Sequence, residues 1–220
     1  MQLRSVFPKL LADYKGHRTM LRKPVAALKS LLGMSTPPKD ARGRRFVAVI
    51  ECALNQNARD AGAACFPSMN LELLQLCHRH DVGILQMPCP EIAALGFERK
   101  RPEGQSLRQA LDSEHGRGRC RVLAMETAER IESYLSQGCA LLAIVGGNPR
   151  SPGCAIHHET EGLAEESGIF MKALQEELRR RGHEAVFQSM RDYDPQLLQQ
   201  DLAQFQKLLV SDRTAPLLRT

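Results

Sequence analysis

The stretch Phe46-Val47-Ala48-Val49-Ile50 decides the fold, because it is apolar at every position. A strand with one solvent-facing side alternates apolar and polar residues, whereas a strand covered on both faces reads as a continuous apolar run. Comparable runs follow at Val82–Met87 and Cys139–Val145, and a shorter one follows at Ala185–Gln188. The sequence therefore predicts four buried strands, the first of them at Arg45–Ile50.

Segments with helical spacing of their apolar residues separate these strands. They span Leu71–His80, Arg121–Gln137, Gly168–Arg181 and Pro195–Leu209. Strands that alternate with helices form parallel sheets with right-handed crossovers. We therefore expect an α/β fold, namely a three-layer, Rossmann-like parallel sheet of about four strands with helices on both faces.

The first 44 residues differ in composition from the rest of the 220-residue chain. Residues 1–45 hold eleven Lys and Arg side chains but only two acids, Asp13 and Asp40, whereas the whole chain has a net charge of only +5. The stretch Ser35-Thr36-Pro37-Pro38 then interrupts regular structure. We expect a basic N-terminal extension and linker over residues 1–44, and one α/β domain over residues 45–220.

The basic extension has three interpretations. Its excess of cations favours an anionic partner, such as a nucleic acid or a membrane surface. The alternatives are a solubilising or docking arm without a specific partner, and an Arg-rich organellar transit peptide.

The composition excludes several classes of protein. No run approaches the ~18 apolar residues of a membrane-spanning helix, and the N-terminus lacks the apolar core of a secretory signal. We therefore expect a cytoplasmic protein without a transmembrane segment. The seven cysteines are scattered and include no Cys-x-x-Cys pair, so free thiols or metal ligands are expected rather than disulfides. The chain also contains no GxGxxG or GxxxxGK[ST] phosphate-binding loop.

Three cysteines follow predicted strands closely. Cys52, Cys89 and Cys154 come after the first, second and third apolar runs. Ligands of open parallel sheets collect outside the carboxyl ends of the strands, so we expect these thiols to converge there. Three thiolates suit a soft metal or an iron–sulfur cluster and leave one coordination position free. The remaining cysteines are expected to be loop or packing residues: Cys65, Cys77, Cys120 and Cys139.

The loop after the first strand is rich in carboxamides and carries an arginine. Asn55 and its neighbours offer both hydrogen-bond donors and acceptors, which suits recognition of a planar heterocycle. Arg59 is suited to hold an anion or to stack on a ring. The alternative is a polar loop that only satisfies its own backbone.

The two later loops add groups for proton transfer. Glu91 follows Cys89 within Pro88-Cys89-Pro90-Glu91, and a carboxylate in such a crevice can serve as a general acid or base. The alternative is that Glu91 lies at the start of a following helix, where its negative charge interacts favourably with the helix dipole. Ser151 lies three residues before Cys154, close enough to contact anything that this thiolate binds. His157 is expected at most to lie close to the metal ligands without being a ligand itself.

These motifs together resemble the thiouracil desulfidase (TudS) family and its related branch of desulfidases. The likeness covers roughly residues 45–190, and one departure is that the family's Ser-Pro-Ser-Cys-Gly is Ser-Pro-Gly-Cys-Ala here. That departure puts pocket shape and substrate choice in question. The matching positions are Cys52-x-Leu54 with Arg59 and Gly62, Cys89-Pro90-Glu91, Leu95-Gly96 with Arg99, Ser151-Pro152-x-Cys154 and Gly168-Ile169-Phe170.

The resemblance implies a cofactor and an activity. It implies a [4Fe-4S] cluster on Cys52, Cys89 and Cys154, with a fourth iron open to the sulfur of a thiolated, thio-nucleobase-like substrate. It further implies that Glu91 and Ser151 form an acid/base pair. Asn55 and Arg59 are then candidates for substrate orientation. The expected function is a non-redox desulfidase that releases sulfide.

Two other functions remain open at this point. A cluster-bearing protein without turnover of its own would deliver sulfur or electrons to a partner, with the basic extension docking to RNA or to an acidic protein. A zinc hydrolase would use the same three cysteines together with His157.

Overall fold

The computed structural model describes residues 40–211 of the chain. The chain divides between Arg42 and Gly43 into two units, and the sheet and its helices belong to the second unit. Almost all of the predicted basic extension over residues 1–44 lies outside the described residues.

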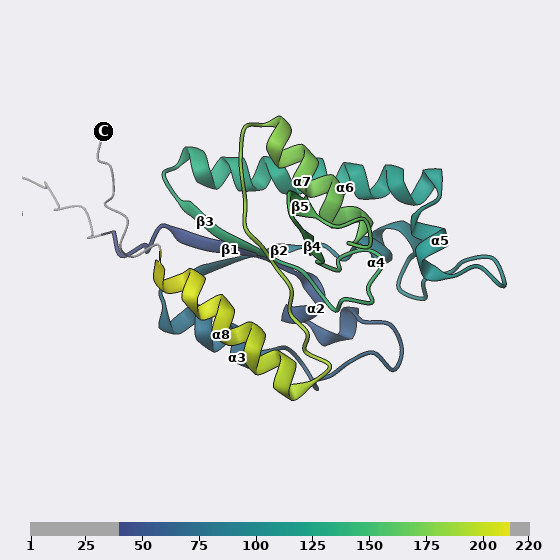
Figure 1. Cartoon of the computed structure of the whole chain (residues 1–220), viewed down its shortest axis with the longest axis horizontal. Coiled ribbons are helices and arrows are strands. Elements are labelled where there is room, and N and C mark those ends of the chain that lie inside the picture. Colours follow the sequence, from purple (N-terminus) through teal and green to yellow (C-terminus); the bar gives the residue numbers. More distant parts are fainter. Residues whose placement is uncertain (1–39, 212–220) are drawn as a thin grey trace, which may run out of the picture. The chain divides into compact units, whose positions relative to one another are not determined.

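One four-stranded parallel sheet forms the centre of the second unit (Figure 1). The strand order is β2-β1-β3-β6, and every pair of neighbours is parallel. The carboxyl ends of the three long strands are level, because Ile50 pairs with Met87 and Val49 pairs with Val145. The strands are β1 (Arg45–Ile50), β2 (Gly83–Met87), β3 (Ala140–Val145) and β6 (Phe187–Gln188).

Helices cover both faces of this sheet. Figure 1 shows α3 and α8 on one face and α6 and α7 on the other. The chain therefore has the predicted three-layer, Rossmann-like α/β fold. The described helices are α2 (Glu51–Leu54), α3 (Leu71–Arg79), α4 (Pro90–Leu95), α5 (Leu107–Leu111), α6 (Glu114–Ser136), α7 (Ile169–Arg180) and α8 (Pro195–Ser211), with the 3-10 helix η1 (Gln56–Ala58).

The apolar run that predicted the first strand is buried as expected. Val47, Ala48, Val49 and Ile50 are all fully buried in β1, at the centre of the sheet. Side chains of a strand alternate between the two faces of a sheet, so burial at four successive positions requires cover on both sides. The two helical layers provide this cover.

Several details differ from the predicted elements, and the short helices α2, α4 and α5 were not predicted. The long helix begins at Glu114 and not at Arg121, because Ser113 accepts a hydrogen bond from the Gly116 amide and caps the helix. β6 pairs only at Phe187–Gln188, so the prediction of a strand from Ala185 was too long. A short antiparallel pair of β4 (His158–Glu159) and β5 (Gly162–Leu163) was not predicted.

The topology creates a crevice at the carboxyl ends of β1 and β3. From β1 the chain passes through α3 to β2, then returns through α6 to β3 on the other side of β1. The helix that follows β1 and the helix that follows β3 thus lie on opposite faces (Figure 1). Open α/β sheets bind ligands at the point where the chain stops adding strands on one side of the first strand and begins to add them on the other. No helix within residues 40–211 is long and apolar enough to cross a membrane.

Candidate functional site

A cavity of about 300 Å³ opens at this end of the sheet and brings together the three predicted thiols. Cys52, Cys89 and Cys154 all line it, and they arrive from the segments after β1, β2 and β3. Glu91, Ser151 and Arg59 line the same cavity.

Local structure connects the first two thiols. Cys52 lies in the first turn of α2, and Cys89 is the residue that caps the N-terminus of α4. The neighbour of Cys52, Glu51, accepts a hydrogen bond from the Cys89 amide at 2.9 Å. Pro90 follows at the first position of α4, where a missing amide hydrogen costs no helical bond. The segments after β1 and β2 are therefore tied together beside the cavity.

The N-terminus of α7 holds the third thiol in place. The Ile169 and Phe170 amides donate hydrogen bonds to the Pro152 and Gly153 carbonyls at 2.9 and 3.1 Å. A Cβ on Gly168 would lie 2.3 Å from the Gly153 oxygen, so only glycine allows this close approach. The Gly168-Ile169-Phe170 motif therefore serves to dock α7 against the loop that carries Cys154.

Gly147 leaves space beside two of the sulfurs. A Cβ at this position would lie 2.7 Å from the Cys154 Sγ and 4.0 Å from the Cys52 Sγ. The first distance is far below a van der Waals contact, so any side chain would displace the Cys154 thiol. The absence of a side chain at Gly147 thus allows the Cys154 thiol to occupy its position in the cavity wall.

Glu91 and Ser151 form a hydrogen-bonded pair within the cavity. The Ser151 hydroxyl lies 2.8 Å from the Glu91 Oε1 and 3.1 Å from the Cys154 Sγ. The other carboxylate oxygen, Oε2, accepts a hydrogen bond from the Arg99 Nε at 2.9 Å. The buried Arg99 guanidinium also donates to the Ala58 carbonyl at 2.7 Å. Arg99 thus fixes the carboxylate so that one oxygen faces Ser151.

The three thiols differ in acidity. A hydrogen bond with Cys154 and the positive charge of Arg59 lower the pKa of Cys52, although burial opposes this change. The same hydrogen bond, together with burial, raises the pKa of Cys154 well above its usual value. Burial raises the pKa of Cys89 to about 11. Binding of a metal to Cys89 and Cys154 would therefore release protons.

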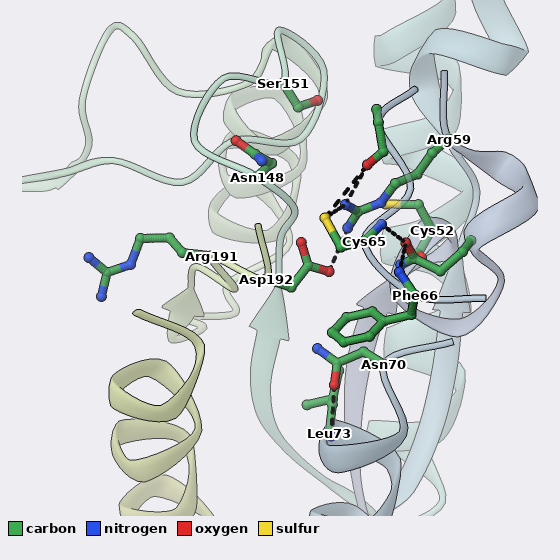
Figure 2. A network of polar contacts seen from close by, with 12 residues as sticks. Cys52, Arg59, Cys65, Phe66, Asn70, Leu73, Asn148, Ser151, Arg191 and Asp192 are labelled. Atoms are coloured by element: carbon green, nitrogen blue, oxygen red, sulfur yellow. Dashed lines mark hydrogen bonds and ion pairs between the residues drawn. The ribbon is translucent and has the colours of Figure 1, made fainter. Parts of the chain in front are cut away.

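Arg59 is held by a buried ion pair. Its Nη2 lies 2.5 Å from the Asp192 Oδ2, and the exposed fractions of the two side chains are 8% and 1%. Its Nη1 donates to the Ala63 carbonyl and to the Cys65 Sγ, both at 3.1 Å. Figure 2 shows the guanidinium next to Cys65 and Asp192, with Cys52 close by. Most of its donors are thus bound to protein atoms.

Two of the predicted candidates lie outside the cavity lining. Asn55 is exposed, and its Oδ1 accepts hydrogen bonds from the Asn57 amide and side chain at 3.1 and 2.9 Å. It thus caps η1, which agrees with the alternative of a loop that satisfies its own backbone. The Nε2 of His157 lies 2.9 Å from the Pro149 carbonyl oxygen and is absent from the cavity wall.

The three thiols line the same cavity, and two of them, Cys52 and Cys154, are hydrogen-bonded to each other. Among residues 40–211, no three His, Cys, Asp or Glu side chains are grouped closely enough to hold a single metal ion.

Sequence reasoning missed two residues of the site. Arg99 belongs to a motif, but nothing in the sequence relates it to Glu91, eight residues earlier. Asp192 lies outside every motif, because it follows the edge strand β6 and reaches Arg59 only in the folded chain. The nearest signal in the sequence is the positive charge of Arg59, which requires a partner when buried.

Comparison with known proteins assigns no family. No family model matches the chain, and no solved structure matches it significantly. Among curated proteins, the chain is 27% identical over 125 residues to an uncharacterized protein of Methanocaldococcus jannaschii. That match covers 57% of this chain and 76% of the archaeal protein, whose description carries no activity.

Proposed function

We propose that this chain is a [4Fe-4S]-dependent, non-redox desulfidase. Its substrate is a thiolated small molecule of the thio-nucleobase type, and its products are the oxygenated molecule and sulfide. The proposal includes a reducing, cytoplasmic environment, which suits the free thiols of the described cysteines.

One observation carries the proposal. Three thiols from three strand ends line a single cavity, and a hydrogen-bonded Glu91–Ser151 pair lies in the same wall, with the Ser151 hydroxyl 3.1 Å from the Cys154 Sγ. Soft sulfur donors together with a carboxylate and a hydroxyl are the groups that sulfur removal requires: a site for the sulfur and a path for protons.

The donor set suits a cluster. A cluster binds its thiolates on separate irons, and three thiols from three strand ends line one cavity here. Gly147 provides the space beside Cys154 and Cys52 that a larger residue would fill. Cys52, Cys89 and Cys154 would hold the group, which supplies an iron with a free position for a soft sulfur atom.

The side chains of the cavity wall then move the protons. In the overall reaction, C=S and water become C=O and hydrogen sulfide, so no electrons are gained or lost. Glu91 accepts a proton from the water through the Ser151 hydroxyl, which lies 2.8 Å from its Oε1. The same pair returns this proton to the departing sulfur and then passes it the proton that remains on the added oxygen, so both protons of the water leave as hydrogen sulfide. Arg99 keeps the Glu91 carboxylate aimed at Ser151 throughout.

Anaerobic reconstitution tests the cofactor. The wild-type protein should bind about four irons and as many acid-labile sulfides per chain. The variants Cys52→Ala, Cys89→Ala and Cys154→Ala should lose them. Cys139→Ala is the matched control, because Cys139 precedes β3 and lies outside the cavity lining. A colourless, iron-free wild-type protein after reconstitution would refute the proposal, and elemental analysis would reveal zinc.

Sulfide release tests the activity. The reconstituted protein is incubated with thiouracils and thiolated nucleosides, and the sulfide and the oxygenated base are both quantified. Release of the two products in equal amounts supports a desulfidase. An intact cluster without turnover of any such compound would contradict it and favour a sulfur-carrier or accessory protein.

A further inference from the structure

The ion pair between Arg59 and Asp192 connects the cavity to a part of the fold that carries none of the predicted site residues. Arg59 lines the cavity from the segment after η1, whereas Asp192 lies between β6 and α8. The sequence likeness to desulfidases ends near residue 190, so it does not include this carboxylate. Figure 2 shows the two side chains meeting from different segments.

The segment around Asp192 is anchored on both sides. The Arg191 amide donates to the Asp201 Oδ2 at 2.7 Å, and the Arg191 Nη2 lies 2.5 Å from the Asp201 Oδ1. In Figure 2 the Arg191 side chain points away from Arg59. On the other side, Asp194 accepts hydrogen bonds from the Gln196 and Leu197 amides at the start of α8. The Asp192 carboxylate is therefore presented from a fixed backbone.

The pair is not arranged for maximal stability. A buried pair recovers its desolvation cost only when its remaining donors and acceptors are also satisfied. The Asp192 Oδ1 is buried and has no hydrogen-bond partner among the described residues. A contribution to stability alone therefore does not explain why this ion pair is buried. Its effect on the position of the Arg59 guanidinium does explain it. One terminal nitrogen of the guanidinium, Nη2, binds Asp192. The other terminal nitrogen, Nη1, donates to the Ala63 carbonyl and to the Cys65 Sγ.

We propose that Asp192 is a positioning residue, which holds the Arg59 guanidinium in the cavity wall beside Cys52. With respect to substrate, the inference rests on the proposed function: the fixed guanidinium forms part of the wall against which the thiolated molecule lies. Asp192 itself is absent from the cavity lining and acts only through Arg59. The segment after β6 thereby contributes to substrate recognition.

The first test does not require activity or cofactor. Phenylglyoxal modifies accessible guanidinium groups, and peptide mapping of the full-length, iron-free protein reports each arginine separately. In the wild type, Arg59 should react slowly, because its side chain is 8% exposed and ion-paired. In Asp192→Asn and Asp192→Ala, Arg59 should react about tenfold faster or more, since a charge-assisted bond is lost. Asp192→Glu should restore part of the protection.

Internal and matched controls accompany this measurement. Arg150, an exposed arginine of the same cavity, should react equally fast in every variant. Glu177→Gln breaks an ion pair elsewhere, on α7, and should leave Arg59 protected. If Arg59 stays as slow in both Asp192→Asn and Asp192→Ala as in the wild type, Asp192 does not position it and the inference is wrong.

The second test uses the reconstituted enzyme and a double-mutant cycle. Arg59→Ala and Asp192→Ala should each raise KM more than they lower kcat, and the double variant should be no worse than Arg59→Ala alone. Effects on kcat/KM that add in the double variant would show that Asp192 does not act through Arg59. If the wild type releases no sulfide, the proposed function fails, while the phenylglyoxal test still decides the inference.

Discussion

Ser151 makes three contacts of the candidate site through one hydroxyl group, and one of them is a hydrogen bond accepted from the Cys154 amide at 3.2 Å. It lies 2.8 Å from the Glu91 Oε1 and 3.1 Å from the Cys154 Sγ. Ser151→Ala interrupts the proton path but removes none of the three cysteines. We expect sulfide release to fall by about 10²-fold or more, as for loss of a proton-transfer group, while the iron content stays unchanged. Ser133→Ala, on the exposed side of α6, is the control. Equal rates in both variants would remove Ser151 from the mechanism.

Gly147 permits a second prediction at the scale of single residues. In Gly147→Ala, the new methyl group would lie 2.7 Å from the Cys154 Sγ, so the thiol has to move. We expect the iron bound after reconstitution to fall severalfold, because Cys154 no longer faces the cavity. Gly118→Ala is the matched control, since nothing lies within 4 Å of its added Cβ, and it should gain about 0.5–1 kcal/mol in helix α6. Full iron content in Gly147→Ala would contradict the assigned role.

The site residues that the sequence predicted share a physical property. Cys52, Cys89 and Cys154 follow strands, and the ends of neighbouring parallel strands must meet at one edge. Arg99 and Asp192 could not be predicted in the same way, because their positions depend on how loops pack once the sheet exists. Each is a buried charge that meets its partner through the tertiary fold. The sequence thus locates the thiols but not the charges that orient the groups beside them.

At the scale of elements, ion pairs connect the two helices on one face of the sheet. Arg181 at the end of α7 bonds Glu177 of the same helix and Glu132 of α6, each at 2.7 Å. Hydrogen bonds from Arg180 and Arg181 lower the pKa of Glu177 from 4.5 to about 2. The folded state therefore keeps this carboxylate ionised at pH values where the unfolded state takes up a proton, so its stabilisation is lost as the pH falls from about 4.5 to about 2.

Thermal unfolding of Glu177→Gln tests this network. At pH 7 the Tm should fall by about 1–3 °C, the size expected for a surface ion-pair network in a domain of this length. The difference from the wild type should then shrink as the pH is lowered from 4.5 towards 2. Glu176→Gln changes the neighbouring carboxylate, for which the structure gives no ion pair, and should leave the Tm unchanged. A Tm difference that grows on acidification would contradict the direction of the pKa shift.

Periodicity predicted the long helices and the buried strands better than it predicted their ends. The existence of α6 was predicted, but two residues of the apolar spacing that predicted it, Val122 and Met125, are exposed. Its first turns are polar and are set by the cap at Ser113. The buried apolar residues of the helix are Cys120, Leu123, Ala124, Ala128 and Ile131. The short β4–β5 pair has no apolar alternation, because both strands are two residues long. Its position depends on the turn between them and on contacts with α7, such as the bond from Arg179 to the Glu161 carbonyl. Local sequence carries little information about contacts of this kind.

At the scale of the whole molecule, the division between Arg42 and Gly43 predicts that the second unit folds and functions without the first. Residues 1–42 carry nine Lys and Arg side chains against two Asp, while none of the cavity residues lies among them. Deleting residues 1–42 should therefore leave the Tm, the iron content and sulfide release of small substrates unchanged. The physical reason is that the sheet, both helical layers and the cavity all lie within the second unit.

The same deletion separates catalysis from binding to an anionic partner. Full-length and truncated proteins are compared for binding to RNA and to anionic vesicles at increasing salt. If the extension binds polyanions, the full-length protein should show the steeper loss of affinity with salt, because each neutralised phosphate releases a counterion. Equal, weak binding by both proteins would leave the extension as a solubilising arm. A truncated protein that loses iron or unfolds would instead contradict the independence of the second unit.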